Sequence, residues 1–316
     1  MESSSCCVCH KPLGNDAPHL GNRAYCAEHW AKLSHTRGSS WRSSVIYVVA
    51  VALFALGAAL VLPALQPSLS DTGLLLAGIV LALVPAVLWL AFFYVQDRLE
   101  PEPKGYVLAV FTLGALLAAA IGIPVVRNLF NVQDWLGKSL LVDLLGSILI
   151  VGFVQEFLKY AAVRYSVFNL PEFDERLDGV LYGTAAGLGF ATALNIHYVV
   201  SNDGVNLGMA AIQVTVTALA QASFAGITGY FLGRAKFEEE PVWWLAAGLT
   251  LAATLNGVFH VLLGNLVRSG SALSGQTINP WLGLVLATVL AAASLAVILG
   301  LMRRASRLTL AGADVA

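Results

Sequence analysis

Eight apolar stretches of about 20 residues or more run through the sequence. A helix of about 20 apolar residues is long enough to span the hydrocarbon core of a bilayer. The stretches cover residues 45–65, 72–95, 105–126, 139–165, 178–200, 209–233, 241–268 and 279–302. Only 12% of the residues are charged, whereas soluble domains carry about 25%. The sequence therefore predicts an all-α polytopic membrane protein with about eight transmembrane helices.

Cationic residues are distributed unevenly between the two sides of these helices. With the N-terminus in the cytoplasm, the outer segments carry only Arg127, Lys138 and Arg268. The cytoplasmic segments then carry Lys32, Arg37, Arg42, Arg98, Lys104, Arg164, Arg176, Arg234, Lys236, Arg303, Arg304 and Arg307. Because cytoplasmic loops usually hold the excess of Lys and Arg, we expect both termini to be cytoplasmic. The net charge of −1 gives no basis for binding nucleic acid, so the expected surroundings are the lipid bilayer.

The polar segment before the first apolar stretch contains all four cysteines of the chain. Cys6-x-x-Cys9 is followed, after sixteen residues, by Cys26-x-x-His29. Two such pairs have the ligand number and spacing of a structural zinc site. Bound Zn²⁺ would replace the apolar core that so short a segment lacks. We therefore expect these four side chains to hold Zn²⁺ in a LIM-like or treble-clef-like finger, in a reducing cytoplasm.

The alternative to a finger is a disordered, cysteine-rich tail. Three further side chains are candidate ligands: Cys7, His10 and His19. A closed site with four protein ligands is structural, so we expect the finger to serve folding or docking rather than catalysis. The predicted organisation is a finger at 1–35, a linker at 36–44, a transmembrane domain at 45–303 and a cytoplasmic tail at 304–316.

Polar side chains occur deep inside four of the predicted spans. Glu156 and Lys159 are three residues apart, so they share a helix face and can pair with each other. The other polar positions are Gln155, Thr192, Asn195, His197, Gln221, Ser223, Asn256, His260 and Asn265. A charged side chain at the bilayer centre costs about 2.5–3.5 kcal/mol on insertion scales, so it usually faces a protein interior or a water-filled cavity. Four polar helices that converge would build an intramembrane site.

Each of these residues also has a purely structural interpretation. Glu156 and Lys159 could be a buried pair that packs helices, and Asn195 and Asn256 could be hydrogen-bonding residues between helices. A single histidine on an apolar helix, such as His260, is usually a satisfied core residue. These alternatives remain open from the residues alone.

Several segments of the membrane region carry a family resemblance. QDRLEPEPKGYVLAVFTLGAL, at Gln96–Leu116, contains an EPEP loop before an apolar helix. It is followed by QEFLK, by EFDERLDGVLYGTAAGLGFATALN and by ASFAGITGYFLGRA. In this order the segments resemble the PrsW family of intramembrane proteases, which is related to the bacterial CAAX-protease-like membrane enzymes. The resemblance covers about residues 96–265. It implies a protein of the bacterial inner (plasma) membrane that acts on membrane-anchored proteins.

The chain departs from the motifs of that family at three positions. The family motif EExxK has Gln155 in place of its first Glu, while Glu156 and Lys159 are kept. The motif FxxxEN has Leu194 in place of its Glu, directly before Asn195. A histidine of the third motif is replaced by Gln221, and a later histidine is present as His260. All three replacements remove a group that titrates.

These departures bear on catalysis because peptide hydrolysis needs a group that takes a proton from water and returns it to the leaving amine. Glu156 is the carboxylate that remains in the motifs, and Lys159 is placed to neutralise it. His197 lies three residues from Leu194 and could in principle replace the lost glutamate. The sequence therefore predicts that hydrolysis is weak or absent.

Three functions are compatible with these features. In an intramembrane endopeptidase, Glu156 would be the base and Lys159 its partner, Asn195 and His260 would polarise the scissile carbonyl, and the catalytic metal is not identified. In a catalytically inactive pseudoprotease, the same fold would bind or regulate a membrane protein partner, with the finger as a docking module. A transporter or channel could use the same polar cavity, but no duplicated halves or pairs of broken helices support it.

Overall fold

The computed structural model describes residues 5–6, 9–14, 16–20, 23–34, 40–65, 69–96, 104–173, 176–201, 206–267 and 280–313. The N-terminal segment forms strands β1 (His19–Leu20) and β2 (Arg23–Ala24), which pair antiparallel, and helix α1 (Ala27–Ser34). The membrane region begins with α2 (Ser40–Leu65), α3 (Asp71–Gln96) and α4 (Lys104–Leu117). It continues through α5 (Val132–Trp135), α6 (Leu140–Gly146), α7 (Phe153–Ser166), α8 (Arg176–Ser201), α9 (Leu207–Phe237), α10 (Trp244–Val267) and α11 (Pro280–Ala313).

Three segments between these helices have π-helical hydrogen bonding. They are η2 (Ala118–Gly122), η3 (Val125–Leu129) and η4 (Ser147–Gly152). The segments η2 and η3 continue α4, and η4 joins α6 to α7, so each combination forms one long helical span. π-Helical turns widen a helix locally and occur often at functional sites.

Six helical segments of the described residues are long and apolar enough to cross a membrane. Two shorter apolar helices, at Val48–Ala64 and Trp281–Ser294, lie within α2 and α11. Together they coincide with the eight apolar stretches of the sequence, so the predicted all-α polytopic architecture is confirmed. Helix α2 begins at Ser40, inside the predicted linker, and α11 extends to Ala313, inside the predicted tail. The EPEP loop lies outside the described residues.

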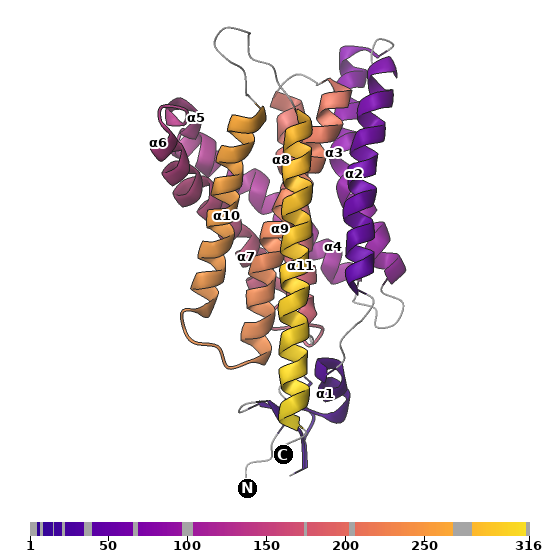
Figure 1. The fold of residues 1–316 in the computed structure, drawn as a ribbon, viewed down its shortest axis with the longest axis vertical. Coiled ribbons are helices and arrows are strands. Elements are labelled where there is room, and N and C mark those ends of the chain that lie inside the picture. Colours follow the sequence, from indigo (N-terminus) through magenta and orange to yellow (C-terminus); the bar gives the residue numbers. More distant parts are fainter. Residues whose placement is uncertain are drawn as a thin grey trace.

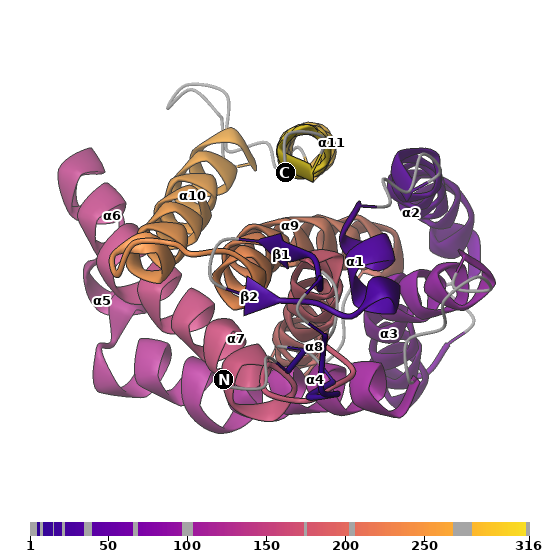
Figure 2. The same cartoon turned by 90° about the horizontal axis from the view of Figure 1, so that it is seen from below.

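Helices α8 and α9 form the centre of the molecule. They are the most deeply buried of the six spans. In Figure 1, α2 and α3 lie on one side of them, α5, α6 and α10 lie on the other, and the two chain ends lie together at the bottom. Seen from that end, the N-terminal segment lies over the ends of α8 and α9 (Figure 2). The fold therefore encloses the helices that carry Asn195 and Gln221.

Glycine allows the central helices to approach each other closely. A Cβ atom added at Gly179 of α8 would lie 2.2 Å from the carbonyl oxygen of Gly229 on α9. At Gly152 of η4, an added Cβ would lie 2.2 Å from the carbonyl oxygen of Ala253 on α10. Small residues at helix contacts are the usual way in which membrane helices pack, because lipid removes the hydrophobic drive between them. The second contact fixes α10 against the start of α7.

Candidate functional site

The predicted pair of Glu156 and Lys159 forms a buried ion pair near the start of α7. The Lys159 ammonium donates a hydrogen bond to Glu156 Oε1, and the side chains of Lys159 and Glu156 are 1% and 0% exposed, respectively. The ammonium also lies over the rings of Phe190 and Phe224, at 5.5 and 6.0 Å from their centroids. Such ring faces attract cations. Helix α7 thus places both charged side chains inside the protein, because exposure of a charge to lipid is costly.

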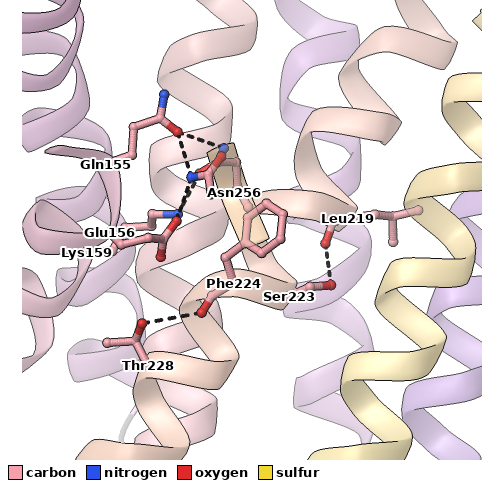
Figure 3. A network of polar contacts seen from close by, with 9 residues as sticks. Gln155, Glu156, Lys159, Leu219, Ser223, Phe224, Thr228 and Asn256 are labelled. Atoms are coloured by element: carbon pink, nitrogen blue, oxygen red, sulfur yellow. Dashed lines mark hydrogen bonds and ion pairs between the residues drawn. The ribbon is translucent and has the colours of Figure 1, made fainter. Parts of the chain in front are cut away.

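Amide side chains from three helices complete the cluster around this ion pair. Gln221 of α9 accepts a hydrogen bond from Lys159 Nζ at 2.6 Å, and its amide nitrogen donates to Gln155 Oε1 at 3.0 Å. Asn256 Nδ2 of α10 lies 2.7 Å from Glu156 Oε1 and 3.0 Å from Gln155 Oε1. Figure 3 shows Gln155, Glu156 and Lys159 of α7 directed toward Asn256. We call these five residues the amide cluster.

The amide cluster is closed to solvent and nearly complete in its hydrogen bonding. Gln155, Gln221 and Asn256 are 9%, 6% and 3% exposed. Among the described side chains of the cluster, only Glu156 Oε2 is a buried polar atom without a hydrogen-bond partner. In a medium of low dielectric constant the paired groups hold each other strongly, and an unpaired buried group is costly. The arrangement therefore resembles an ordered network with one free acceptor.

The other residues predicted for the site make contacts elsewhere. Asn195 Nδ2 donates to the backbone carbonyl of Val214 at 3.1 Å, and Leu194 packs in an apolar group with Ala118, Leu158 and Phe190. Ser223 and Thr228, also drawn in Figure 3, bond to carbonyl oxygens of α9 itself.

The two histidines of the membrane region also bond away from the cluster. His260 Nδ1 lies 3.2 Å from Ser147 Oγ at the start of η4. His197 Nε2 lies 2.8 Å from Arg127 Nη1, on an exposed part of the molecule.

Asn256 is the cluster residue that sequence reasoning did not place in the site. It was recognisable as a polar residue in an apolar helix, but nothing in its spacing connects it with Glu156. The contact depends on the close packing of α10 against η4, where an added Cβ at Gly257 would lie 2.5 Å from Ile148 Cα. The adjacent residues Asn256 and Gly257 were the available signal. Gly257 allows α10 to approach η4 closely, and Asn256 then reaches Glu156 and Gln155.

The N-terminal ligand set assembles as the sequence predicts. The ligand atoms of Cys6, Cys9, Cys26 and His29 all lie within 4.8 Å of one another. The sulfur atoms of Cys9 and Cys26 are 3.9 Å apart, and His29 Nδ1 lies 3.7 Å from Cys6 Sγ and 3.0 Å from Cys26 Sγ. A tetrahedral ion with metal–sulfur bonds of about 2.3 Å separates its sulfur ligands by roughly 3.8 Å. The donor set and its spacing therefore fit a bound metal ion.

Burial affects the chemistry of these thiols. Desolvation raises the pKa of the Cys9 thiol above its ordinary value, and the neighbouring sulfur atoms of Cys6 and Cys26 add to the rise. A thiol must lose its proton to become a metal ligand, and the charge of a bound divalent cation favours that loss. The thiols are therefore arranged to hold a cation rather than to react freely.

Comparison with known proteins identifies the membrane region. Residues 102–298 match the family described as "PrsW family intramembrane metalloprotease". The chain belongs to the PrsW family. Among the PrsW proteins, Protease PrsW of Halalkalibacterium halodurans is 32% identical over 185 residues, which are 58% of this chain and 81% of that protein. Protease PrsW of Bacillus subtilis is 31% identical over 183 residues, covering 57% and 80%, and that of Geobacillus kaustophilus is 33% identical over 180 residues, covering 57% and 76%. No solved structure matches the chain.

The PrsW description implies a metal, and the amide cluster does not fit one. Protein sites for catalytic zinc use His, Cys or carboxylate ligands, usually three. The cluster offers one carboxylate, and the ammonium of Lys159 is bonded to it. The oxygens of Gln155 and Gln221 already accept hydrogen bonds. Among the described residues, the group of His, Cys or carboxylate side chains that could hold a metal is the N-terminal one, which lies outside the PrsW match.

Proposed function

We propose that this PrsW protein binds a membrane-anchored protein within the bilayer and has little or no peptidase activity. The observation that carries the proposal is the amide cluster. Its one acid, Glu156, is paired with Lys159, and the two motif positions that carry amides, Gln155 and Gln221, bond to each other. A membrane protein partner is supported by the family, whose description and relatives are intramembrane proteases.

The chemical reasoning concerns proton transfer. Gln155 and Gln221 can orient a water molecule, but neither amide takes up its proton. Leu194 is the remaining one of the three altered motif positions, and it packs among apolar side chains. Glu156 Oε1 is held by Lys159 and Asn256, and water would have to enter a cluster that is closed to solvent before the carboxylate could act as a base.

An active peptidase is the second candidate, and one observation favours it. Glu156 Oε2 has no hydrogen-bond partner in the described part of the chain, so that atom is free to accept a proton from water. In this case Glu156 would be the base and Lys159 its partner. Asn195 and His260 would act on the scissile carbonyl only after a rearrangement, since both are bonded elsewhere.

Restoring the family motifs tests the proposal. The triple variant Gln155→Glu, Leu194→Glu, Gln221→His should cleave single-span proteins in proteoliposomes that the parent leaves intact. Cleavage by the triple variant should disappear when Glu156→Gln is added. A triple variant that folds, as shown by its circular dichroism, and still gives no cleavage would contradict the view that these three positions account for the loss of activity.

We also propose that the N-terminal metal is Zn²⁺ and that the finger lies in the cytoplasm. Three thiols and one imidazole form a typical structural zinc set, and the cationic residues favour a cytoplasmic N-terminus. Metal analysis of the purified full-length protein should give one zinc per chain, and Cys9→Ser should remove it. Less than a tenth of an equivalent of zinc in the parent would refute this assignment.

A further inference from the structure

The finger is seated on the membrane domain through Tyr25, the residue directly before the ligand Cys26. Tyr25 is 0% exposed, and its hydroxyl donates a hydrogen bond of 3.0 Å to the backbone carbonyl of Phe237, the last residue of α9. The last carbonyls of a helix have no partner within the helix. The Tyr25 side chain of the finger thus provides a hydrogen-bond donor for the last carbonyl of α9, the helix that carries Gln221.

Apolar packing continues from the finger into the membrane domain. Cys6 and Tyr25 belong to the same buried cluster as Phe173, Tyr182 and Phe237. The ring of Phe173 stacks on Phe237 with a centroid distance of 6.2 Å and on Tyr182 of α8 with a distance of 5.9 Å. The finger therefore completes an apolar core that is shared between the two parts.

Charged residues tie the ends of α8 and α9 together beside this contact. Arg176, the first residue of α8, is 5% exposed and lies 3.0 Å from Glu238. Arg234 of α9 pairs with Glu238 and with Glu240, each at 2.5 Å. Lys236 donates to the carbonyl of Leu170 at 3.0 Å. Buried charges are costly unless they are paired, so these ion pairs help to hold the ends of α8 and α9 in place.

We propose that the finger is a metal-dependent clasp within the chain: with its metal bound, it holds the ends of α8 and α9 together. This inference rests on the metal assignment proposed above. The finger is too small to order itself by an apolar core, so the metal supplies its folding free energy. Without the metal, Tyr25 would lose the fixed position from which it reaches Phe237. The surface of the membrane domain that is covered by Cys6 and Tyr25 would then be exposed.

In this proposal, the finger docks on the membrane domain of its own chain. Tyr25 is adjacent to the ligand Cys26, so loss of the metal should also disturb the docking contact. Helices α8 and α9 pack through glycines such as Gly179 and Gly229. This packing does not depend on the finger, so release of the finger should loosen only the ends of the two helices.

Hydrogen exchange on the full-length protein in nanodiscs tests the clasp. Removing zinc with a chelator should speed exchange at least ten-fold in the segments 170–180 and 232–240, while 144–160, which lies farther along the bundle, stays unchanged. Equal exchange in the zinc-loaded and zinc-free proteins would overturn the proposal. Zinc content, measured in parallel, separates the two assignments: absence of zinc refutes both, whereas bound zinc without an effect on exchange refutes the clasp alone.

A variant that keeps the metal isolates the docking contact. Tyr25→Phe removes only the hydroxyl, so zinc should remain at one equivalent and exchange at 234–240 should rise about five-fold, the factor that corresponds to a net hydrogen bond of about 1 kcal/mol. Tyr25→Ala should give a larger rise with zinc still bound. Tyr165→Phe is the matched control, because Tyr165 is 79% exposed. If chelation unfolds the whole protein, unchanged exchange in zinc-loaded Tyr25→Ala still overturns the clasp.

Discussion

Replacing Lys159 by methionine should destabilise the protein strongly. Met has a similar length but no charge, so the variant leaves the Glu156 carboxylate buried at 0% exposure with Asn256 as its remaining donor. Removing one member of a buried ion pair typically costs about 3–5 kcal/mol. Gln221 Oε1 also loses the ammonium that donates to it, and a buried acceptor without a partner costs about 1–3 kcal/mol. Because the two effects overlap, we expect a loss of at least about 3 kcal/mol.

The measurement is reversible unfolding in mixed detergent micelles, followed by circular dichroism. The double variant Glu156→Gln, Lys159→Met should lose less than the sum of the single variants, with a coupling of about 2 kcal/mol. Arg164→Met is the matched control on the same helix, because Arg164 is half-buried and, among the described residues, contacts Asn169 at 3.3 Å and the ring of Phe168. A loss below about 1 kcal/mol for Lys159→Met, with additive single variants, would refute the view of the amide cluster as a mutually dependent network.

Two further predictions concern packing and hydrogen bonding. Gly179→Val should cost about 3 kcal/mol or prevent folding, because its Cβ would lie 2.2 Å from the backbone oxygen of Gly229. An added Cβ at Gly57 meets nothing within 4 Å, so Gly57→Val should cost nothing measurable in the same unfolding assay, and equal effects of the two variants would contradict the packing. Asn256→Leu should cost about 1–3 kcal/mol by leaving acceptors of the cluster unsatisfied, while Asn265→Leu, which loses one bond to its own helix, should stay within about 1 kcal/mol. A reversed order would show that Asn256 does not connect α10 with α7.

Much of the architecture follows from the sequence because lipid restricts the choices. A run of about 20 apolar residues must form a helix whose backbone groups bond internally, so the spans are readable one by one. The pairing of Glu156 with Lys159 was also accessible, since it depends on neighbours within one helix. The metal ligands could be found because their spacing is local to two tight turns. The PrsW resemblance, which rested on ordered motifs, is confirmed by the family match.

The contacts between helices could not be read from the sequence. The bonds of Gln221 and Asn256 to α7 depend on which faces of three helices meet, and periodicity does not specify this in helices that are apolar all round. The π-helical segment η4 shifts the face of α7 relative to α6, and its sequence, SILIVG, carries no mark of this. The docking of Tyr25 joins residues 212 positions apart. These three features are tertiary, and they decide what the site can do.

Cleavage by the unaltered protein tests the central claim most directly. Purified parent and its Glu156→Gln variant would be reconstituted into proteoliposomes with a library of single-span proteins, and the products would be identified by mass spectrometry. The proposed function predicts no cleavage that depends on Glu156, so both proteins should give the same product list. Robust cleavage by the parent that Glu156→Gln abolishes would contradict it and establish the chain as an active peptidase.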